Sequence, residues 1–499
     1  MKHLFPIVAS VLCAQIAFAG GLELASPFTD GLVLQRERPV PVWGTAEPGR
    51  SVTVSFGGQT LMTTASTSGA WRVDLAPLAA SKESRELVVE AEKRVTVKDV
   101  LVGEVWIVSG QSNAEFPLVG PNPRFRDRQG ALVAQMTYRD SIRFAWSNGG
   151  PFAEKPQAKT PNRVEWKRFT PKNLSEGRSF SALGVYFALE LYGALDIPIG
   201  LIGPYWGGTA IDPWIPEEGW ASRPDLEDIR TRPFVSQKDW TNAHKEGVYN
   251  GPHQQPRVIW NARVAPWTPF AVRGVVWYQG ESNLVDGPRY TAKMHAFYAG
   301  WSKKFENPDL KFYYAQVAPW GDNRIAVLQQ AQAQYELEEP HAAMAVINDL
   351  GNLRDIHPNE KELVAKRLAV HALRRDYGFT DIQDNSPRLR SWKVENGRFK
   401  LGFDFVRNWY VYNPDRAMTV GFEVAGADGK WHPAELGNIY KDGSGNPDGK
   451  IIGTELEVFS RDVPEPEKLR YLHQRPWFGA LYNDVNLPLG AFEIATSAN

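Results

Sequence analysis

The chain of 499 residues is 43% hydrophobic and 23% charged, and its formal net charge is −1 at pH 7. This length predicts two to three domains rather than one hydrophobic core. Because no basic surplus is available to neutralise phosphates, the composition excludes a typical nucleic-acid-binding protein.

The first 19 residues have the pattern of a secretory signal peptide. Lys2 supplies positive charge, residues 4–14 are largely apolar, and Ala17-Phe18-Ala19 is a small-x-small cleavage pattern. The apolar stretch is too short to span a membrane. Leu12 stands before Cys13 where a lipoprotein signal has a small residue, so we expect no membrane anchor. The sequence thus predicts a bacterial protein that is secreted or periplasmic.

Cys13 is the only cysteine of the chain and lies inside this leader. The mature protein would have no thiol. A cysteine nucleophile, a thiolate metal site and a disulfide framework are therefore excluded.

Residues 20–100 read as short strands with turns that contain Gly and Pro. Stretches such as "SVTVSFGGQ", "WRVDL" and "RELVVEAE" alternate polar and apolar residues. This period of two predicts a small antiparallel β-sandwich or jelly roll without helices.

Residues 101–380 change to an alternation of apolar strands and helices. Strands are predicted at 105–108 and in "IPIGLIG", "AVRGVVWYQ", "KFYYAQVAP" and "AAMAVIND". Helices are predicted at 181–195, near 288–305 and in "NEKELVAKRLAVHALRRDYG". This order indicates an α/β region whose parallel sheet is covered on both faces. Residues 119–178 and 216–256 look like long insertions near its rim. Residues 381–499 return to short strands and form a second β region, with a Gly/Asp loop at 438–450.

Polar residues follow four of the predicted strands. They are Gly110-Gln111-Ser112-Asn113, Gly207-Gly208-Thr209, the run Gln279 to Asn283, and Asp355-Ile356-His357-Pro358. In open α/β sheets, ligands bind at the carboxyl ends of the strands. The four stretches therefore predict one site on one rim.

The residue types at this rim are those of acyl transfer. Ser112 offers a hydroxyl, His357 can accept its proton, and a carboxylate can hold the imidazole in the right tautomer. Backbone N–H groups at a glycine turn and a side-chain amide can stabilise an oxyanion. Ser112 alone could also cap a helix. The chain has no P-loop and no dinucleotide fingerprint, and its other histidines lack a metal-binding spacing, so we expect no cofactor and no metal.

Four stretches resemble the sialate O-acetylesterase family, a group of SGNH-type carbohydrate esterases: "VGEVWIVSGQSNAEFP", "IGLIGPYWGGTAIDPW", "RGVVWYQGESN" and "DIHPNEKELVAKRLA". Both terminal β regions resemble accessory regions of that family as well. The resemblance implies an SGNH-hydrolase three-layer α/β/α core and removal of acetyl groups from sugar hydroxyls.

Carried over by position, the resemblance implies that Ser112 is the nucleophile and His357 the general base. The carboxylate that orients His357 would be Asp355, with Asp349 as the alternative. One departure from the family pattern is Ala114, where relatives usually carry Met.

The oxyanion hole implied by the resemblance combines the Ser112 N–H with Gly208 and Gln279. Gly207 and Asn283 are the alternates for these two residues. Three further residues of the motifs, Glu281, Asn113 and Trp206, are expected to contact the substrate.

The predicted function is a secreted serine esterase that deacetylates a carbohydrate. The substrate would be an acetylated plant polysaccharide such as xylan, xyloglucan or pectin, or else 9-O-acetyl sialic acid. The rim insertions carry arginines that could contact a sialate carboxylate or simply be solvated: Arg124, Arg126, Arg230 and Arg232. The rim also has aromatic residues that could line a sugar cleft or fill the core: Trp220, Trp240, Tyr249 and Trp260.

Two other classes of function are alternatives. One is a carbohydrate-binding protein without catalysis, which would have no need of a base. The other is a lipase or peptidase, and against it the G-x-S-x-G elbow is absent around Ser112. The sequence does not predict an oligomeric state.

Overall fold

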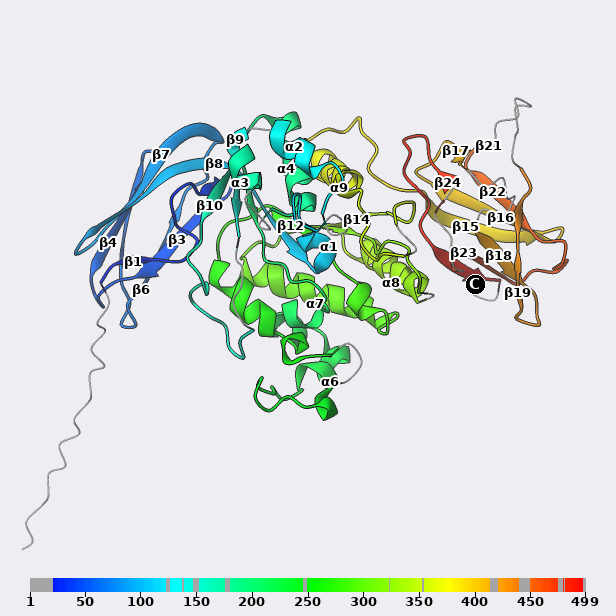
Figure 1. The fold of residues 1–499 in the computed structure, drawn as a ribbon, viewed down its shortest axis with the longest axis horizontal. Coiled ribbons are helices and arrows are strands. Elements are labelled where there is room, and N and C mark those ends of the chain that lie inside the picture. Colours follow the sequence, from blue (N-terminus) through cyan, green and yellow to red (C-terminus); the bar gives the residue numbers. More distant parts are fainter. Residues whose placement is uncertain are drawn as a thin grey trace, which may run out of the picture.

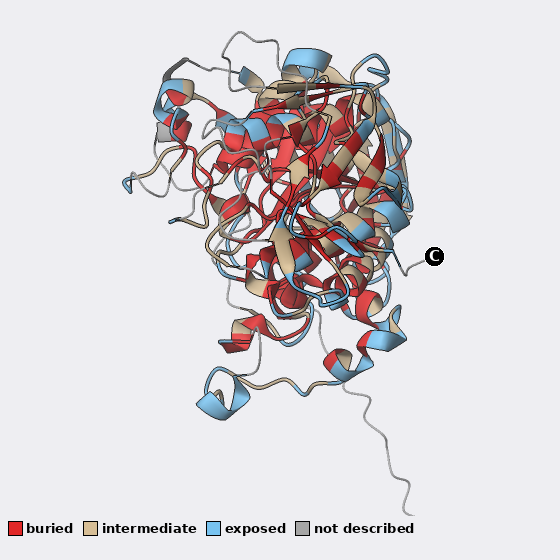
Figure 2. Ribbon diagram, turned by 90° about the vertical axis from the view of Figure 1, so that its right-hand side faces the viewer, coloured by how far each residue is buried: buried red, intermediate tan, exposed pale blue. Residues whose placement is uncertain are grey.

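The computed structural model describes residues 21–122, 126–136, 139–146, 152–175, 180–245, 249–322, 324–351, 354–412, 421–438, 449–473, 479 and 481–496. The predicted signal peptide at 1–19 lies outside these residues. Figure 1 shows an N-terminal β region at one end, a central part of helices and sheet, and a C-terminal β region at the other end. Figure 2, a view along the long axis, shows buried residues mostly in the interior of the outline and exposed residues mostly at its edge.

The N-terminal region consists of short strands, as its alternating pattern predicts. The strands are β1 (Glu23–Leu24), β2 (Val33–Gln35), β3 (Val40–Thr45), β4 (Ser51–Phe56), β5 (Gln59–Thr64), β6 (Ala70–Leu75) and β7 (Ser81–Glu90). Strands β1, β3 and β6 form one antiparallel sheet, and β4 pairs with β5 and β7. In β4 every second residue is buried, which is what a sheet with one core face requires.

Strand β8 (Arg94–Gly110) connects the N-terminal strands with the central sheet. Its first half pairs antiparallel with β7. Its second half pairs parallel with two strands of the central sheet, and residues 100–110 are all buried. The strand therefore runs through the predicted domain boundary at residue 100. The division into 20–100, 101–380 and 381–499 stays a prediction.

The central sheet has the strand order β10-β9-β11-β8-β12-β13-β14. The strands not yet introduced are β9 (Arg139–Ala145), β10 (Trp166–Phe169), β11 (Ile199–Ile202), β12 (Gly274–Tyr278), β13 (Lys311–Ala315) and β14 (Ala342–Ala345). All neighbours are parallel except β9 and β10. Because β9 and β10 belong to residues 119–178, the expectation that this stretch is only a rim insertion is corrected.

Helices cover both faces of this sheet. Alternate residues of β8 and β12 enter two separate clusters, so Val275 and Trp277 face one side while Val276 and Tyr278 face the other. The first side packs against α7 (Arg289–Lys304) and α8 (Ile325–Glu338), and the second against α4 (Ala182–Leu195) and α9 (Lys361–Asp376). Figure 1 shows α4 and α9 on one side of the sheet and α7 on the other. This two-sided burial explains why the strands are apolar without alternation. The mixed α/β class predicted from the sequence is confirmed.

The remaining helices are short. They are α1 (Ser112–Glu115), α2 (Gly130–Met136), α3 (Pro171–Ser175), α5 (Glu217–Ala221), α6 (Glu227–Arg230), the 3-10 turns η1 (Asp212–Trp214), η2 (Pro224–Leu226), η3 (Asn242–His244), η4 (Pro252–Gln254), η6 (Ala265–Trp267) and η7 (Glu281–Asn283), and one π turn, η5 (Trp260–Val264).

The C-terminal region has its own core, which includes Phe399, Trp409 and Leu469. Its strands are β15 (Arg388–Glu395), β16 (Arg398–Asp404), β17 (Asn408–Val411), β18 (Phe422–Ala425), β19 (Trp431–Pro433), β20 (Glu435–Leu436), β21 (Gly449–Ile452), β22 (Glu455–Phe459), β23 (Lys468–Tyr471), β24 (Leu481–Tyr482) and β25 (Phe492–Ala495). They form sheets of order β15-β16-β22-β20, β21-β17-β24 and β19-β18-β23-β25. Most of the predicted loop at 438–450 lies outside the described residues.

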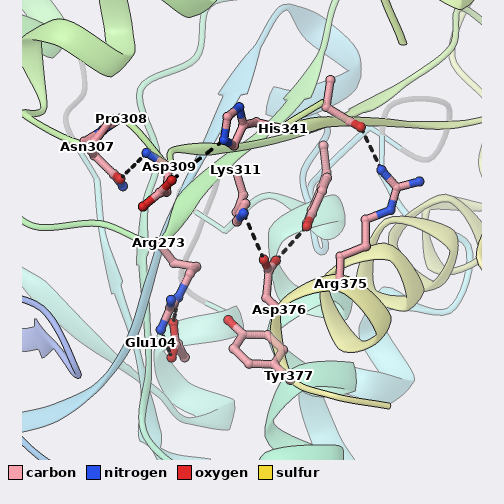
Figure 3. A network of polar contacts seen from close by, with 12 residues as sticks. Glu104, Arg273, Asn307, Pro308, Asp309, Lys311, His341, Arg375, Asp376 and Tyr377 are labelled. Atoms are coloured by element: carbon pink, nitrogen blue, oxygen red, sulfur yellow. Dashed lines mark hydrogen bonds and ion pairs between the residues drawn. The ribbon is translucent and has the colours of Figure 1, made fainter. Parts of the chain in front are cut away.

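A buried ionic network lies in the half of the central sheet that is opposite to the carboxyl ends of its parallel strands (Figure 3). The Glu104 side chain is fully buried, and both of its oxygens accept hydrogen bonds from Arg273, at 2.9 Å each. Arg36 adds a contact of 2.5 Å. Burial by itself would raise the pKa of Glu104, but the hydrogen bonds and charge of Arg273 and Arg36 hold it below its ordinary value. The network thereby ties β8 to the segment that enters β12.

Candidate active site

The first motif begins where β8 ends, at a residue that must be glycine. Gly110 has a φ of 135°, and a Cβ there would lie 2.1 Å from the carbonyl oxygen of Tyr278. Gln111 then donates its backbone N–H to the same carbonyl, at 3.1 Å. This close approach turns the chain sharply, so Ser112 opens α1 at the carboxyl edge of the sheet.

Ser112, His357 and Asp355 form a continuous hydrogen-bonded chain. Ser112 Oγ lies 2.9 Å from His357 Nε2, and His357 Nδ1 lies 2.8 Å from Asp355 Oδ1. The same Asp355 oxygen accepts the backbone N–H of His357 at 3.0 Å. Asp349 instead binds Arg367 through both carboxylate oxygens, at 2.7 and 2.6 Å. Of the two candidate carboxylates, the structure brings only Asp355 to the imidazole.

The His357 imidazole is 19% exposed, and burial lowers its pKa, although Asp355 acts in the opposite direction. The ring is therefore neutral near pH 7 and can accept a proton. The residue that caps α1 is Gln111, not Ser112, and it makes no side-chain capping bond. The Ser112 hydroxyl is thus directed to His357 rather than to a helix end.

The two glycines of the second motif differ in their hydrogen bonds. Gly207 donates its N–H to the Glu115 carboxylate at 2.7 Å, and burial raises the pKa of that carboxyl group. Gly208 has a φ of 75°, no atom lies within 4 Å of a Cβ built on it, and it lines the same cleft as Ser112 and His357. Of the two candidates, the structure brings Gly208 to the cleft.

Gln279 does not reach this cleft. Its side chain is fully buried, and its amide nitrogen lies 2.7 Å from Asn283 Oδ1, 3.1 Å from the Thr209 carbonyl oxygen and 3.2 Å from Gln111 Oε1. Its own oxygen accepts the Tyr290 hydroxyl at 2.7 Å. The Gln279 amide, which was the expected oxyanion donor, is therefore hydrogen-bonded to interior groups instead of facing the cleft.

The side-chain amide of Asn283, the alternate oxyanion donor, is also hydrogen-bonded to interior groups. Its nitrogen donates to Asp286 at 2.7 Å and to Asp212 at 3.2 Å, and its oxygen accepts the backbone N–H of Ile211 at 2.9 Å. Lys293, also buried, binds both aspartates. This network fixes the loop after β12 against the loop after β11.

A different amide, that of Gln111, lines the cleft beside Ser112. Its Oε1 faces three donors, which are the N–H groups of Ser282 (3.3 Å) and Gly280 (3.4 Å) and the amide nitrogen of Gln279 (3.2 Å). Backbone N–H groups can only donate, so this atom is the oxygen and the amide nitrogen lies on the other branch of the side chain. Sequence reasoning missed this residue, although it stands directly before Ser112.

Glu281 lines the cleft, whereas Asn113 is completely buried behind it. Asn113 donates to Glu281 at 2.5 Å and to the carbonyl oxygen of Ile356 at 3.2 Å, and it accepts a bond from Lys361 at 2.9 Å. Burial lowers the pKa of Lys361 to about 7 and raises that of Glu281. The expectation that Asn113 contacts substrate is corrected: it connects α1 to the loop that carries His357.

Trp206, the third expected substrate contact, is half-buried in an aromatic and cationic stack. Its ring lies 5.0 Å from that of His253 and 4.1 Å from the Arg263 guanidinium. Arg263 donates to the Tyr205 carbonyl oxygen at 2.9 Å, and burial lowers its pKa to about 10. The stack fixes the position of the backbone segment directly before Gly207.

The loop between β13 and α8 supplies a wall of the cleft that sequence reasoning also missed. Trp320, Asp322 and Arg324 line the cleft together with Leu284 and Val285. The loop follows the carboxyl end of a strand that neighbours β12. The rule that ligands bind at strand ends could therefore have identified it.

The aromatic residues expected to line a sugar cleft are absent from the lining of this one. Trp220, Trp260 and Tyr249 are buried at 0%, 1% and 5% exposure, so they fill the core. Of the arginines, Arg230 binds Glu217 and Glu227, and Arg232 lies over Tyr249. Arg126 donates to the Gly120 carbonyl oxygen, and Arg124 lies outside the described residues.

Two features are absent from the described residues. No group of three or more His, Cys, Asp or Glu side chains there is arranged to hold a metal ion. No helix within the same residues has the length and apolarity needed to cross a membrane.

Comparison with known proteins agrees with the chemistry of this site. The family model described as "Carbohydrate esterase, sialic acid-specific acetylesterase" matches residues 102–373. The sialate O-acetylesterase of Homo sapiens is 26% identical over an alignment of 474 residues that covers 87% of this chain and 86% of the relative. The enzyme of Mus musculus is 27% identical over 455 residues, with coverage of 80% and 82%. The crystal structure of a carbohydrate acetylesterase from Xanthomonas citri has a TM-score of 0.80 and 30% identity, covering 95% of this chain and 99% of that one.

Proposed function

The chain belongs to the sialic acid-specific acetylesterase family of carbohydrate esterases, and we propose that it removes O-acetyl groups from sugars by an acyl-enzyme mechanism. Ser112 is the nucleophile, His357 the general base and Asp355 the residue that orients the imidazole. The observation that carries this proposal is the hydrogen-bonded chain of 2.9 and 2.8 Å at the floor of an open cleft.

In the first half-reaction, Ser112 Oγ attacks the acetyl carbonyl carbon while His357 Nε2 accepts the hydroxyl proton. Asp355 holds the Nδ1–H and stabilises the imidazolium. The tetrahedral intermediate then collapses, the C–O bond to the sugar breaks, and His357 gives its proton to the leaving sugar oxygen. In the second half-reaction, His357 takes a proton from water while the water oxygen attacks the carbonyl carbon of acetyl-Ser112. The bond to Oγ then breaks, Oγ recovers the proton from His357, and acetic acid leaves and ionises in solvent.

The oxyanion hole is formed by the backbone N–H groups of Ser112 and Gly208 and by the side-chain amide of Gln111. Gln111 takes the place that sequence reasoning gave to Gln279, because the Gln279 amide already lies against three interior acceptors. The donors that face Gln111 Oε1 fix its orientation before substrate arrives, and such preorganisation is what makes an oxyanion hole effective.

The proposal extends to the wider organisation of the protein. The central part is an SGNH-type three-layer α/β/α esterase core, flanked by β domains at 20–100 and 381–499. The leader at 1–19 directs a bacterial protein to the periplasm or the exterior. The substrate is an acetylated plant polysaccharide such as xylan or xyloglucan, or 9-O-acetyl sialic acid.

The test is acetate release from acetylated xylan, xyloglucan, pectin and O-acetylated sialoglycan. Ser112→Ala and His357→Ala should each lose nearly all activity and remain folded. Ser282→Ala is the matched control, because this serine lines the same cleft without contacting His357. Acetate release by Ser112→Ala at the wild-type rate would refute the mechanism. Glycan binding by the wild type without acetate release would instead favour a non-catalytic carbohydrate-binding protein.

A further inference from the structure

Two loops, one between β13 and α8 and one after η7, give the cleft that contains Ser112 three apolar side chains. Trp320 is half-buried, and Leu284 and Val285 line the same cleft. Val285 is 56% exposed, which is unusual for an aliphatic side chain beside a polar site. An indole with aliphatic neighbours is suited to the apolar C–H face of a sugar ring.

The loop between β13 and α8 also carries a guanidinium whose charge is already compensated. Arg324 Nε lies 3.0 Å from Asp322 Oδ1, and its terminal nitrogen lies 2.6 Å from Oδ2, so the pair is bidentate. The Arg324 backbone N–H also donates to Asp322, at 2.9 Å. Asp322 is 16% exposed and Arg324 is 56% exposed, so the carboxylate side of the pair is the more enclosed.

The other ionisable groups of the described lining supply no positive charge either. They are Glu281, a carboxyl group, and His357, which must be neutral to act as a base. Lys361, the cation behind the cleft, is completely buried against Asn113 and the Pro358 carbonyl oxygen. Within the part of the chain that the structure describes, a carboxylate entering this cleft would therefore meet no uncompensated cation.

We propose that the sugar that carries the acetyl group is uncharged and stacks on Trp320, and that Asp322 excludes sialates by occupying Arg324. This inference rests on the proposed esterase function. A sialate is a carboxylate at neutral pH, and placing it beside Asp322 without a free cation is unfavourable. A neutral acetylated polysaccharide, such as a xylan chain, carries no such charge.

The experiment compares kcat and KM on three esters: p-nitrophenyl acetate, an acetylated xylo-oligosaccharide and 9-O-acetyl-N-acetylneuraminic acid. The wild type should prefer the neutral sugar over the sialate. Trp320→Ala should raise KM for the neutral sugar about tenfold, a larger change than the one it causes on p-nitrophenyl acetate, which has no sugar ring to stack. Tyr412→Ala, an aromatic 42% exposed in the C-terminal region, is the matched control and should change neither.

The claim that the Asp322 charge excludes sialates is tested by Asp322→Asn, which keeps an oxygen to accept the Arg324 N–H. This variant should raise kcat/KM on the sialate about fivefold, the scale of a partly exposed ion pair. The double variant with Arg324→Gln should abolish that gain. A wild type that prefers the sialate, or an Asp322→Asn variant without any gain, would overturn the inference. Loss of p-nitrophenyl acetate hydrolysis in the wild type would instead refute the esterase function itself, so the two failures are distinguishable.

Discussion

Replacing Gln111 by Glu would remove one donor from the cleft and keep the acceptor that the neighbouring loop needs. One carboxylate oxygen can still accept the N–H groups of Gly280 and Ser282, which lie 3.4 and 3.3 Å from the native oxygen. The second oxygen then replaces the amide N–H group that we propose as an oxyanion donor. The substitution changes a single heavy atom, so the packing around it is kept.

The magnitude follows from the number of donors. Three N–H groups are assigned to the oxyanion, and loss of one such donor typically costs about 10²–10³ in kcat. Replacement by a carboxylate oxygen adds repulsion, so we expect at least the upper part of this range. The Tm should change little, because the two backbone bonds persist.

The assay is steady-state hydrolysis of p-nitrophenyl acetate, together with thermal unfolding. Gln111→Met is the comparison variant. It also lacks the donor, but it leaves two backbone N–H groups without an acceptor, so it should lose about 1–3 kcal/mol of stability as well. If Gln111→Glu kept more than a third of the wild-type kcat, Gln111 would not be an oxyanion donor.

Three further predictions concern the carboxylates and the base. Asp355→Asn should lower kcat about 10⁴-fold, as expected when the imidazole loses its orienting carboxylate, whereas Asp349→Asn should leave kcat unchanged; steady-state kinetics on both variants checks this. Because burial lowers the pKa of His357 and the base must be neutral, the acid limb of kcat/KM should have its midpoint below the ordinary imidazole value of about 6.5; a pH–rate profile with a midpoint above 7 would contradict it. Glu104→Gln should cost about 3–5 kcal/mol in urea unfolding at pH 7, since it leaves Arg273 and Arg36 without their buried partner. The folded pKa of Glu104 is held below its unfolded value of about 4.3. The ionised Glu104 therefore stabilises the fold above a pH of about 4.3, and this stabilisation is lost as pH falls through the folded pKa. The Glu104→Gln variant should lose less stability on acidification than the wild type.

The sequence was informative about backbone elements and about which loops meet. The apolar runs predicted the central strands, and the four polar stretches that follow strands do lie near one edge of the sheet. The sequence left Asp355 and Asp349 open as partners of His357. Both follow β14, and only the three-dimensional path of the loop sends Asp349 to Arg367.

Side-chain direction was the part that the sequence could not predict. Gln279 and Gln111 are both amides next to strand ends, but Gln279 turns into a buried network and Gln111 turns to the cleft. The donors to Gln111 lie 168 to 171 positions away in the chain, whereas the other partners of the Gln279 amide lie 4, 11 and 70 positions away. Lys361 is a lysine in the last predicted helix, a residue type that is usually solvated, yet it is buried beneath the site.

Strands that contain charged residues were also missed. Strand β9 includes Arg143, which is 2% exposed and lies 2.5 Å from Asp99. A buried ion pair of this kind breaks the apolar run that identifies a core strand, so residues 119–178 read as an insertion. The pairing partner is 44 positions away, and no local pattern indicates it.

The central claim is that acetate release proceeds through an acetyl group on Ser112. The most direct measurement is peptide mapping by mass spectrometry after the enzyme has turned over an acetyl ester and has been quenched in acid. We predict acetyl on the peptide that contains Ser112, and its loss in Ser112→Ala but not in Ser282→Ala. Acetate release at the wild-type rate from an enzyme that never carries acetyl on Ser112, even in the pre-steady state, would contradict the account.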